Sequence, residues 1–226
     1  MKKLTLLLIM AFGLITSAFA GMADDPLLYK FTMEKLEVKS TSDYPVEWEA
    51  DLWIGKDLNK VYLYTEGEHE NGETESENQL LYSRAISPFW VLQLGIGYDT
   101  TPDADQIWGV VALQGLAPYY IETRVLLLIN DEGTIGVRFE TEYEALLTQR
   151  LVLTPSLETE LYTEDIPKME IGSGLSALNL GLRLRYEIRR EFAPYIGVEW
   201  EKTYGNTRDY NDIDEARAVA GFRFWF

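Results

Sequence analysis

Residues 178–188 read Leu-Asn-Leu-Gly-Leu-Arg-Leu-Arg-Tyr-Glu-Ile: every even position is apolar, and every odd position is small, polar or charged. In a β-strand these two sets point to opposite faces. A helix would spread the leucines around its axis and leave no polar side. Similar alternation runs through residues 47–54, 91–98, 135–144, 151–161 and 217–226. The period of two predicts strands with one apolar and one polar face.

The connections between these runs alternate between two kinds. Short ones fall at residues 56–59, 86–88, 115–118, 148–149 and 191–194, and longer, acidic or Gly/Asn-rich ones at 39–45, 67–73, 100–105, 130–133, 164–174 and 205–214. Membrane barrels show this pattern, with short periplasmic turns and longer external loops. The predicted strands are 27–38, 46–56, 59–68, 74–84, 89–99, 106–115, 119–130, 134–146, 150–163, 175–188, 192–204 and 214–226. At Pro155 we expect a bulge or a loss of ladder hydrogen bonds.

These patterns predict an all-β fold: a transmembrane, antiparallel, up-and-down β-barrel of about twelve strands, with both ends on the periplasmic side. The last strand ends on Phe226 and carries alternating apolar side chains. It resembles the C-terminal signal by which outer-membrane proteins are recognised for assembly. The alternative is a soluble sandwich or lipocalin-like barrel, in which the leucine faces would form the core.

The first 20 residues have the features of a cleaved signal peptide. Lys2 and Lys3 precede an apolar run from Leu4 to Leu14, and Ala18-Phe19-Ala20 fits a signal-peptidase site. The apolar run is shorter than the roughly 20 residues that span a bilayer as a helix. We therefore expect a signal peptide over 1–20, a short periplasmic lead-in over 21–26 and a barrel over 27–226, in the outer membrane of a Gram-negative bacterium and in contact with its lipid.

The charge and the absence of cysteine narrow the function. The formal net charge is −17, and it becomes −19 when Lys2 and Lys3 leave with the signal peptide. Such a chain repels phosphate, so we expect no nucleic-acid partner. The chain contains no cysteine, so its packing or the membrane must hold an exported fold of this size. An acidic surface is compatible with recruiting cations.

If the apolar faces meet lipid, the polar faces line the lumen and give it an unusually charged interior. Arginines on one predicted strand lie between glutamates on its two neighbours, and charge-assisted hydrogen bonds between them are expected. The predicted lumen network consists of Arg138, Glu140, Glu142, Glu158, Glu160, Arg183, Arg185, Glu199 and Glu201. Paired charges could plug a lumen of this size, or they could line a selective conduit or cation site. The sequence leaves both readings open.

Signatures of catalysis are sparse. The single histidine, His69, lies in an acidic stretch, and no nucleophile elbow, P-loop or His/Cys metal cluster is present. We therefore expect no enzymatic activity. Thiolate, thioether and imidazole donors, which soft metal ions prefer, are scarce. The candidate metal ligands are Glu49, Asp51, Glu66, His69 and Met33.

Several longer strings resemble the copper resistance protein B family. These are residues 24–30, Asp-Asp-Pro-Leu-Leu-Tyr-Lys; 48–55, Trp-Glu-Ala-Asp-Leu-Trp-Ile-Gly; 81–84, Leu-Tyr-Ser-Arg; 115–119, Gly-Leu-Ala-Pro-Tyr; and 172–205, including 182–195, Leu-Arg-Leu-Arg-Tyr-Glu-Ile-Arg-Arg-Glu-Phe-Ala-Pro-Tyr. The resemblance implies an outer-membrane barrel in copper homeostasis or resistance, with copper as its ion and a periplasmic copper protein as a partner. Members often carry a Met- and His-rich stretch before the barrel; here residues 21–25 stand in its place.

Three functions remain after these steps. The resemblance favours copper resistance, by copper binding or by passage of copper across the outer membrane. A polar lumen would also suit a general diffusion channel for small solutes. A plugged structural barrel that docks partners through its acidic loops is the third.

Overall fold

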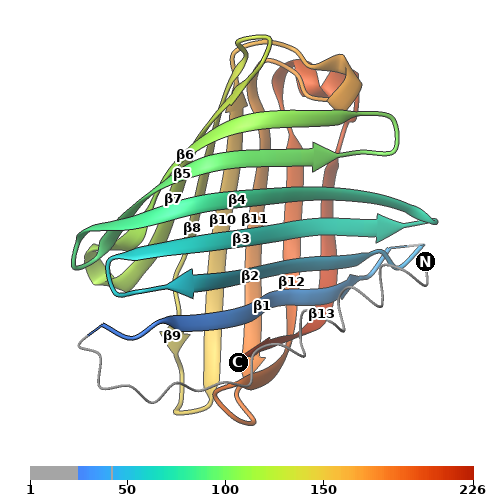
Figure 1. Ribbon diagram of the computed structural model, residues 1–226. Coiled ribbons are helices and arrows are strands. Elements are labelled where there is room, and N and C mark those ends of the chain that lie inside the picture. Colours follow the sequence, from blue (N-terminus) through green and yellow to red (C-terminus); the bar gives the residue numbers. More distant parts are fainter. Residues whose placement is uncertain (1–24, 42) are drawn as a thin grey trace, which may run out of the picture.

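The computed structural model describes residues 25–41 and 43–226, and Figure 1 shows them as a sheet that wraps into a barrel. The expected signal peptide and most of the expected lead-in lie outside the described residues. The strands are β1 (Leu28–Lys39), β2 (Val46–Gly55), β3 (Asn59–Glu70), β4 (Glu73–Ser87), β5 (Trp90–Thr100), β6 (Asp105–Ala117), β7 (Ile121–Asn130), β8 (Ile135–Glu142), β9 (Ala145–Leu146), β10 (Leu151–Tyr162), β11 (Gly174–Tyr186), β12 (Phe192–Thr203) and β13 (Asp214–Trp225). Three short 3-10 helices interrupt the connections: η1 (Pro118–Tyr120), η2 (Pro167–Met169) and η3 (Gly205–Asp209).

The sheet closes on itself through antiparallel pairs. Except that β8 and β9 do not pair with each other, each strand pairs with its neighbour in sequence, and β13 returns to pair with β1. The blue and red strands of Figure 1 therefore lie side by side. Phe31 and Phe226 exchange two backbone hydrogen bonds at this seam. Because β8 and β9 both pair with β10, they are two parts of one strand, and the barrel has the predicted twelve. No helix among the described residues is long and apolar enough to cross a membrane.

The two ends of the barrel differ in the length of their connections. We call the end with the first residues of β1, the last residues of β13 and the short connections the turn end. The other is the loop end, and it carries the longer segments 163–173 and 204–213. One expected long loop is wrong: β3 and β4 continue to a two-residue turn, Asn71-Gly72. Both turn residues have positive φ, which is the conformation that an Asn-Gly hairpin turn requires.

Pro155 explains the break between β8 and β9. Tyr143 donates its amide to the Pro155 carbonyl at 3.1 Å, but Pro155 has no N–H to return. Glu142 pairs with Ser156, and Ala145 pairs with Leu153, so the register is the same on both sides of the break. Of the two expectations for Pro155, the local loss of ladder bonds is therefore correct, and the bulge is absent.

A register shift in β1 decides which of its side chains face the lumen. The shift lies between Met33 and Lys35 in the pairing with β2. Before it, Thr32 is buried; after it, Glu37 and Lys39 are buried. The extra residue moves the inward set from even to odd positions.

Candidate functional site

The lumen contains a cavity of about 640 Å³. Its lining begins at the turn end, with Asp57, Pro88 and Leu116, and extends along the strands to Glu66 and Glu77. Among the described residues, Trp108 and Tyr162 lie nearer the loop end and do not line this cavity. We call this cavity the chamber. Eleven carboxylates and six basic side chains line it, so its walls carry an excess of negative charge.

Arg183 on β11 is held by two glutamates on other strands. Its Nε and Nη2 bind the two carboxylate oxygens of Glu37 at 3.0 and 2.6 Å, and Nη2 also binds Glu199 at 2.8 Å. The side chains of Glu37 and Glu199 are 0% and 3% exposed. A bidentate contact of this kind compensates buried carboxylates for the hydration that they have lost.

Lys39 at the end of β1 shares Glu199 with Arg183 and binds two further carboxylates. Its Nζ lies 2.7 Å from Glu47, 2.8 Å from Glu68 and 3.3 Å from Glu199. We call these six side chains the Lys39–Arg183 cluster. They are Lys39, Arg183, Glu37, Glu47, Glu68 and Glu199.

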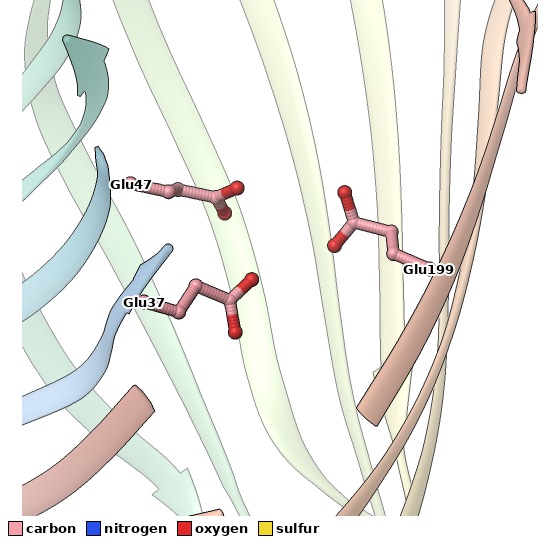
Figure 2. A group of neighbouring side chains, drawn as sticks. All are labelled: Glu37, Glu47 and Glu199. Atoms are coloured by element: carbon pink, nitrogen blue, oxygen red, sulfur yellow. The ribbon is translucent and has the colours of Figure 1, made fainter. Parts of the chain in front are cut away.

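Three of these glutamates meet closely enough to be considered as metal ligands. Figure 2 shows Glu37 and Glu47 facing Glu199, and one oxygen of each lies within 4.8 Å of the others. However, the Lys39 ammonium and the Arg183 guanidinium already bind these carboxylates. A divalent ion would have to displace one of them against like-charge repulsion. The three carboxylates therefore fit the two protein cations better than a metal ion.

Arg138 on β8 forms a second cluster that crosses the lumen. It binds Glu66 on β3 at 2.7 Å, Glu77 on β4 at 2.7 Å and Glu160 on β10 at 2.6 Å, with Glu158 at 3.8 Å. The Arg138 side chain is 3% exposed. We call these five side chains the Arg138 cluster. One guanidinium faces four carboxylates here, so the excess of negative charge extends to this level of the lumen.

A third group lies nearer the turn end. Glu144 receives hydrogen bonds from Arg185 and Arg223, at 2.6 and 3.3 Å. Arg223 also binds Glu34 on the adjacent β1. Glu144 sits in the gap between β8 and β9 opened by Pro155, so the interruption of the ladder places a carboxylate between two arginines.

The pairing differs in part from the sequence-based expectation. Arg183 does bind Glu199 on the neighbouring strand, but its other partner is Glu37 rather than a glutamate of β10. Glu158 and Glu160 bind Arg138 instead, and Glu201 binds Arg217 at 3.0 Å. Glu140 binds Arg124 at 3.5 Å, and Glu142 lines the chamber opposite Glu122. Barrel curvature is the reason, because it brings non-neighbouring strands within reach of long side chains.

The five candidate metal ligands do not come together. Glu49, Asp51 and Glu66 line the chamber, and Glu49 is paired with Lys35 at 2.8 Å. Met33 pairs with Ala50 and Phe224 in the outward row of β1. His69 alternates with the inward Glu66 and Glu68, and its Nδ1 shares a hydrogen bond with the Thr74 hydroxyl at 2.8 Å. The five candidates therefore do not form one site in this structure, because the period of two sends them to opposite faces; a role for each as a single metal ligand stays a prediction.

Some lumen residues were missed by sequence reasoning. Glu37 and Lys39 were missed because the register shift in β1 changes the phase of the alternation. The sequence did carry a sign of this shift, because the outward apolar side chains change from odd positions, Phe31 and Met33, to even positions, Leu36 and Val38.

One wall of the lumen near the loop end is apolar, which was also not predicted. The buried side chains there alternate with exposed ones such as Ile107 and Val111. We call this set the apolar wall, and its members are Leu81, Trp108, Val110, Ala112, Leu126 and Leu128. Strands β6 and β7 are apolar on both faces, so alternation could not distinguish lumen from lipid.

The fold and its lumen define a class of protein, a membrane-spanning β-barrel with a buried, ion-paired interior. A family model for the copper resistance protein B precursor (CopB) matches residues 27–226. The chain belongs to the copper resistance protein B family, which confirms the resemblance found in the sequence.

Curated relatives agree with the family model. The chain is 40% identical over 210 residues to copper resistance protein B of Escherichia coli, covering 90% of this chain and 71% of the relative. It is 40% identical over 203 residues to a copper resistance protein B homolog of Pseudomonas syringae pv. tomato, covering 87% and 69%.

Solved structures with a similar fold are much more distant in sequence. The KdgM porin has a TM-score of 0.56 at 11% identity, covering 87% of this chain and 99% of its own. Outer membrane phospholipase A from Escherichia coli has a TM-score of 0.51 at 12% identity, covering 87% and 92%. At such low identity the likeness shows the barrel fold alone.

Proposed function

We propose that this chain acts in copper resistance at the bacterial outer membrane by passing copper ions through its acidic lumen. The match to copper resistance proteins along the barrel carries this proposal. The signal-peptide pattern of residues 1–20 supports the location. On this reading the turn end faces the periplasm, and the chamber receives or releases copper there, where a periplasmic copper protein could dock.

The side chains that line the chamber suit a metal ion that binds weakly and is released again. Eleven carboxylates against six basic groups attract cations by their summed field. Carboxylate oxygens bind copper less strongly than thiolate, thioether or imidazole groups, and His69 and Met33 face away from the chamber. A pathway requires binding weak enough to allow release, so copper is better treated as a transient substrate than as a resident cofactor.

The proposal assigns no catalytic step to the chain. His69 is at the loop end of β3, where its ring is bonded to Thr74. Replacing His69 by Ala should leave copper tolerance unchanged. A loss of tolerance, with normal amounts of folded barrel, would show that the imidazole has a role that the proposal omits.

A genetic comparison tests the proposed function. Copper tolerance and cell-associated copper are measured in a strain that lacks the gene, with and without a plasmid copy. We expect the gene to raise tolerance and change copper content, with little effect on zinc or nickel tolerance. Equal values in both strains would contradict the proposal. An equal change for unrelated small solutes would favour a general diffusion channel.

A further inference from the structure

The loop between β10 and β11, residues 163–173, is a compact unit. The amides of Ile166 and Ile171 each donate to the other residue's carbonyl, at 2.8 and 3.2 Å, and Met169 donates to Ile166 at 2.9 Å. These bonds enclose the short helix η2. A loop with its own internal bonds can move as one body about its ends.

This loop packs its apolar side chains onto the apolar wall. Ile166 is 8% exposed and belongs to the same buried cluster as Trp108 and Tyr162, with Met169 and Ile171 packed against it. The Trp108 and Tyr162 rings lie 6.1 Å apart beneath the loop. The chamber stops short of these side chains. An apolar contact between the loop and the barrel wall therefore lies beyond the chamber, toward the loop end of the lumen.

A second loop, residues 204–213, holds the first in place. The Gly172 amide donates to the Thr207 hydroxyl at 3.0 Å, and the Asn206 amide group donates to Asp165 at 3.2 Å. At Gly172 the two backbones touch, because an added Cβ would lie 2.1 Å from the Thr207 nitrogen. In Figure 1 these two loops form the orange group at the loop end.

We propose that residues 163–173 are a lid that closes the loop end of the lumen, with Gly172 as the point where it latches to the neighbouring loop. The closed lid leaves the chamber open at the turn end only. Solutes cross the barrel when the lid lifts and the apolar contact around Ile166 opens, as in pores gated by apolar constrictions. This inference concerns the barrel itself and does not depend on the proposed role of copper.

The test combines a reporter in the lid with an electrical measurement. Because the chain has no cysteine, Ile166→Cys introduces a single thiol beneath the lid. In refolded barrels, Gly172→Ala should raise the rate of thiol labelling at least about tenfold by favouring the open lid. In planar bilayers containing KCl and no copper, Gly172→Ala in the otherwise natural chain should raise conductance above that of the parent.

The matched control is Gly109→Ala on β6, where an added Cβ would meet only the Ile129 carbonyl oxygen at 3.6 Å. It should change neither readout, and Ile166→Asp should raise conductance as Gly172→Ala does. Heat-modifiability on gels shows that each variant is folded. Rapid labelling of Ile166→Cys in the chain that keeps Gly172 would mean that the lid does not cover residue 166. Faster labelling in Gly172→Ala without a rise in conductance would mean that the lid does not seal the lumen. Either result overturns the proposal.

Discussion

Arg183 compensates the charge of two deeply buried carboxylates in the lumen. It neutralises Glu37 and Glu199, both almost fully buried. Replacing Arg183 by Met leaves these carboxylates with less compensation, so the free energy of unfolding should fall by about 3 kcal/mol. Urea titration of the refolded barrel measures it. The control is Arg208→Met, which removes an exposed pair with Asp212 and should leave stability almost unchanged. Equal effects of the two variants would contradict the assignment.

Asp165 accepts hydrogen bonds from within the lid and from the neighbouring loop, and these bonds depend on pH in a particular range. The hydrogen bonds from the Ser173 amide, at 2.6 Å, and from Asn206 lower the pKa of Asp165. Because the pKa is lowered in the folded state, the stabilisation is present at neutral pH and is lost only as pH falls through that lowered value.

Hydrogen exchange at the Ser173 amide, corrected for its intrinsic rate, measures its hydrogen bond to Asp165. Protection should stay constant from neutral pH down to about pH 4, near the ordinary aspartate pKa, and should fall only below it. Asp165→Asn should show weaker protection at neutral pH. Protection that is already lost near pH 6, about two units above the ordinary aspartate pKa, would contradict this role for the carboxylate.

At the scale of single elements, Pro155 is the residue that divides one strand into β8 and β9. Pro155→Val supplies the missing N–H opposite the Tyr143 carbonyl, and one added hydrogen bond is worth about 1 kcal/mol. We expect a protected amide at position 155 and slower exchange at Ala145. If the amide at position 155 exchanges as fast as a loop amide, then something other than the proline prevents the hydrogen bonds between the two strands from forming there.

Alternation along the strands was enough to predict the all-β class, the twelve strands and the closing pair. Each of these depends on local pattern. The cross-lumen contacts of Arg138 could not be predicted, because β8 faces β3 and β4 only after the sheet has curved. The burial of Ile166 was also hidden, since a loop residue reveals its contacts only when the apolar wall beneath it is known.

The register shift in β1 shows how a small local feature limits prediction. One extra residue near Glu34 reverses which side chains point inward, and it brings Glu37 and Lys39 into the lumen. Strict alternation would assign these side chains to lipid, where they would be costly. A charged run that falls on the apolar phase of a strand is therefore a signal for a bulge.

At the scale of the whole molecule, the two ends of the barrel differ in their charge and in how open the lumen is to solvent. The chamber is acidic and open at the turn end, whereas the loop end is closed by the lid and the apolar wall. In the chamber, Glu122 and Glu142 face each other directly across β7 and β8. Like charges in this position repel each other, so the proposed passage of copper would place a cation where it relieves this repulsion.

Copper entry into proteoliposomes tests the central claim most directly. A copper-sensitive dye is enclosed in vesicles that carry the refolded barrel, and Cu²⁺ is added outside. We predict slow entry with the parent, faster entry with Gly172→Ala, and slower entry again when Glu122→Gln and Glu142→Gln are added to it. Entry no faster than in protein-free vesicles, from variants that conduct KCl, would contradict passage of copper through this lumen.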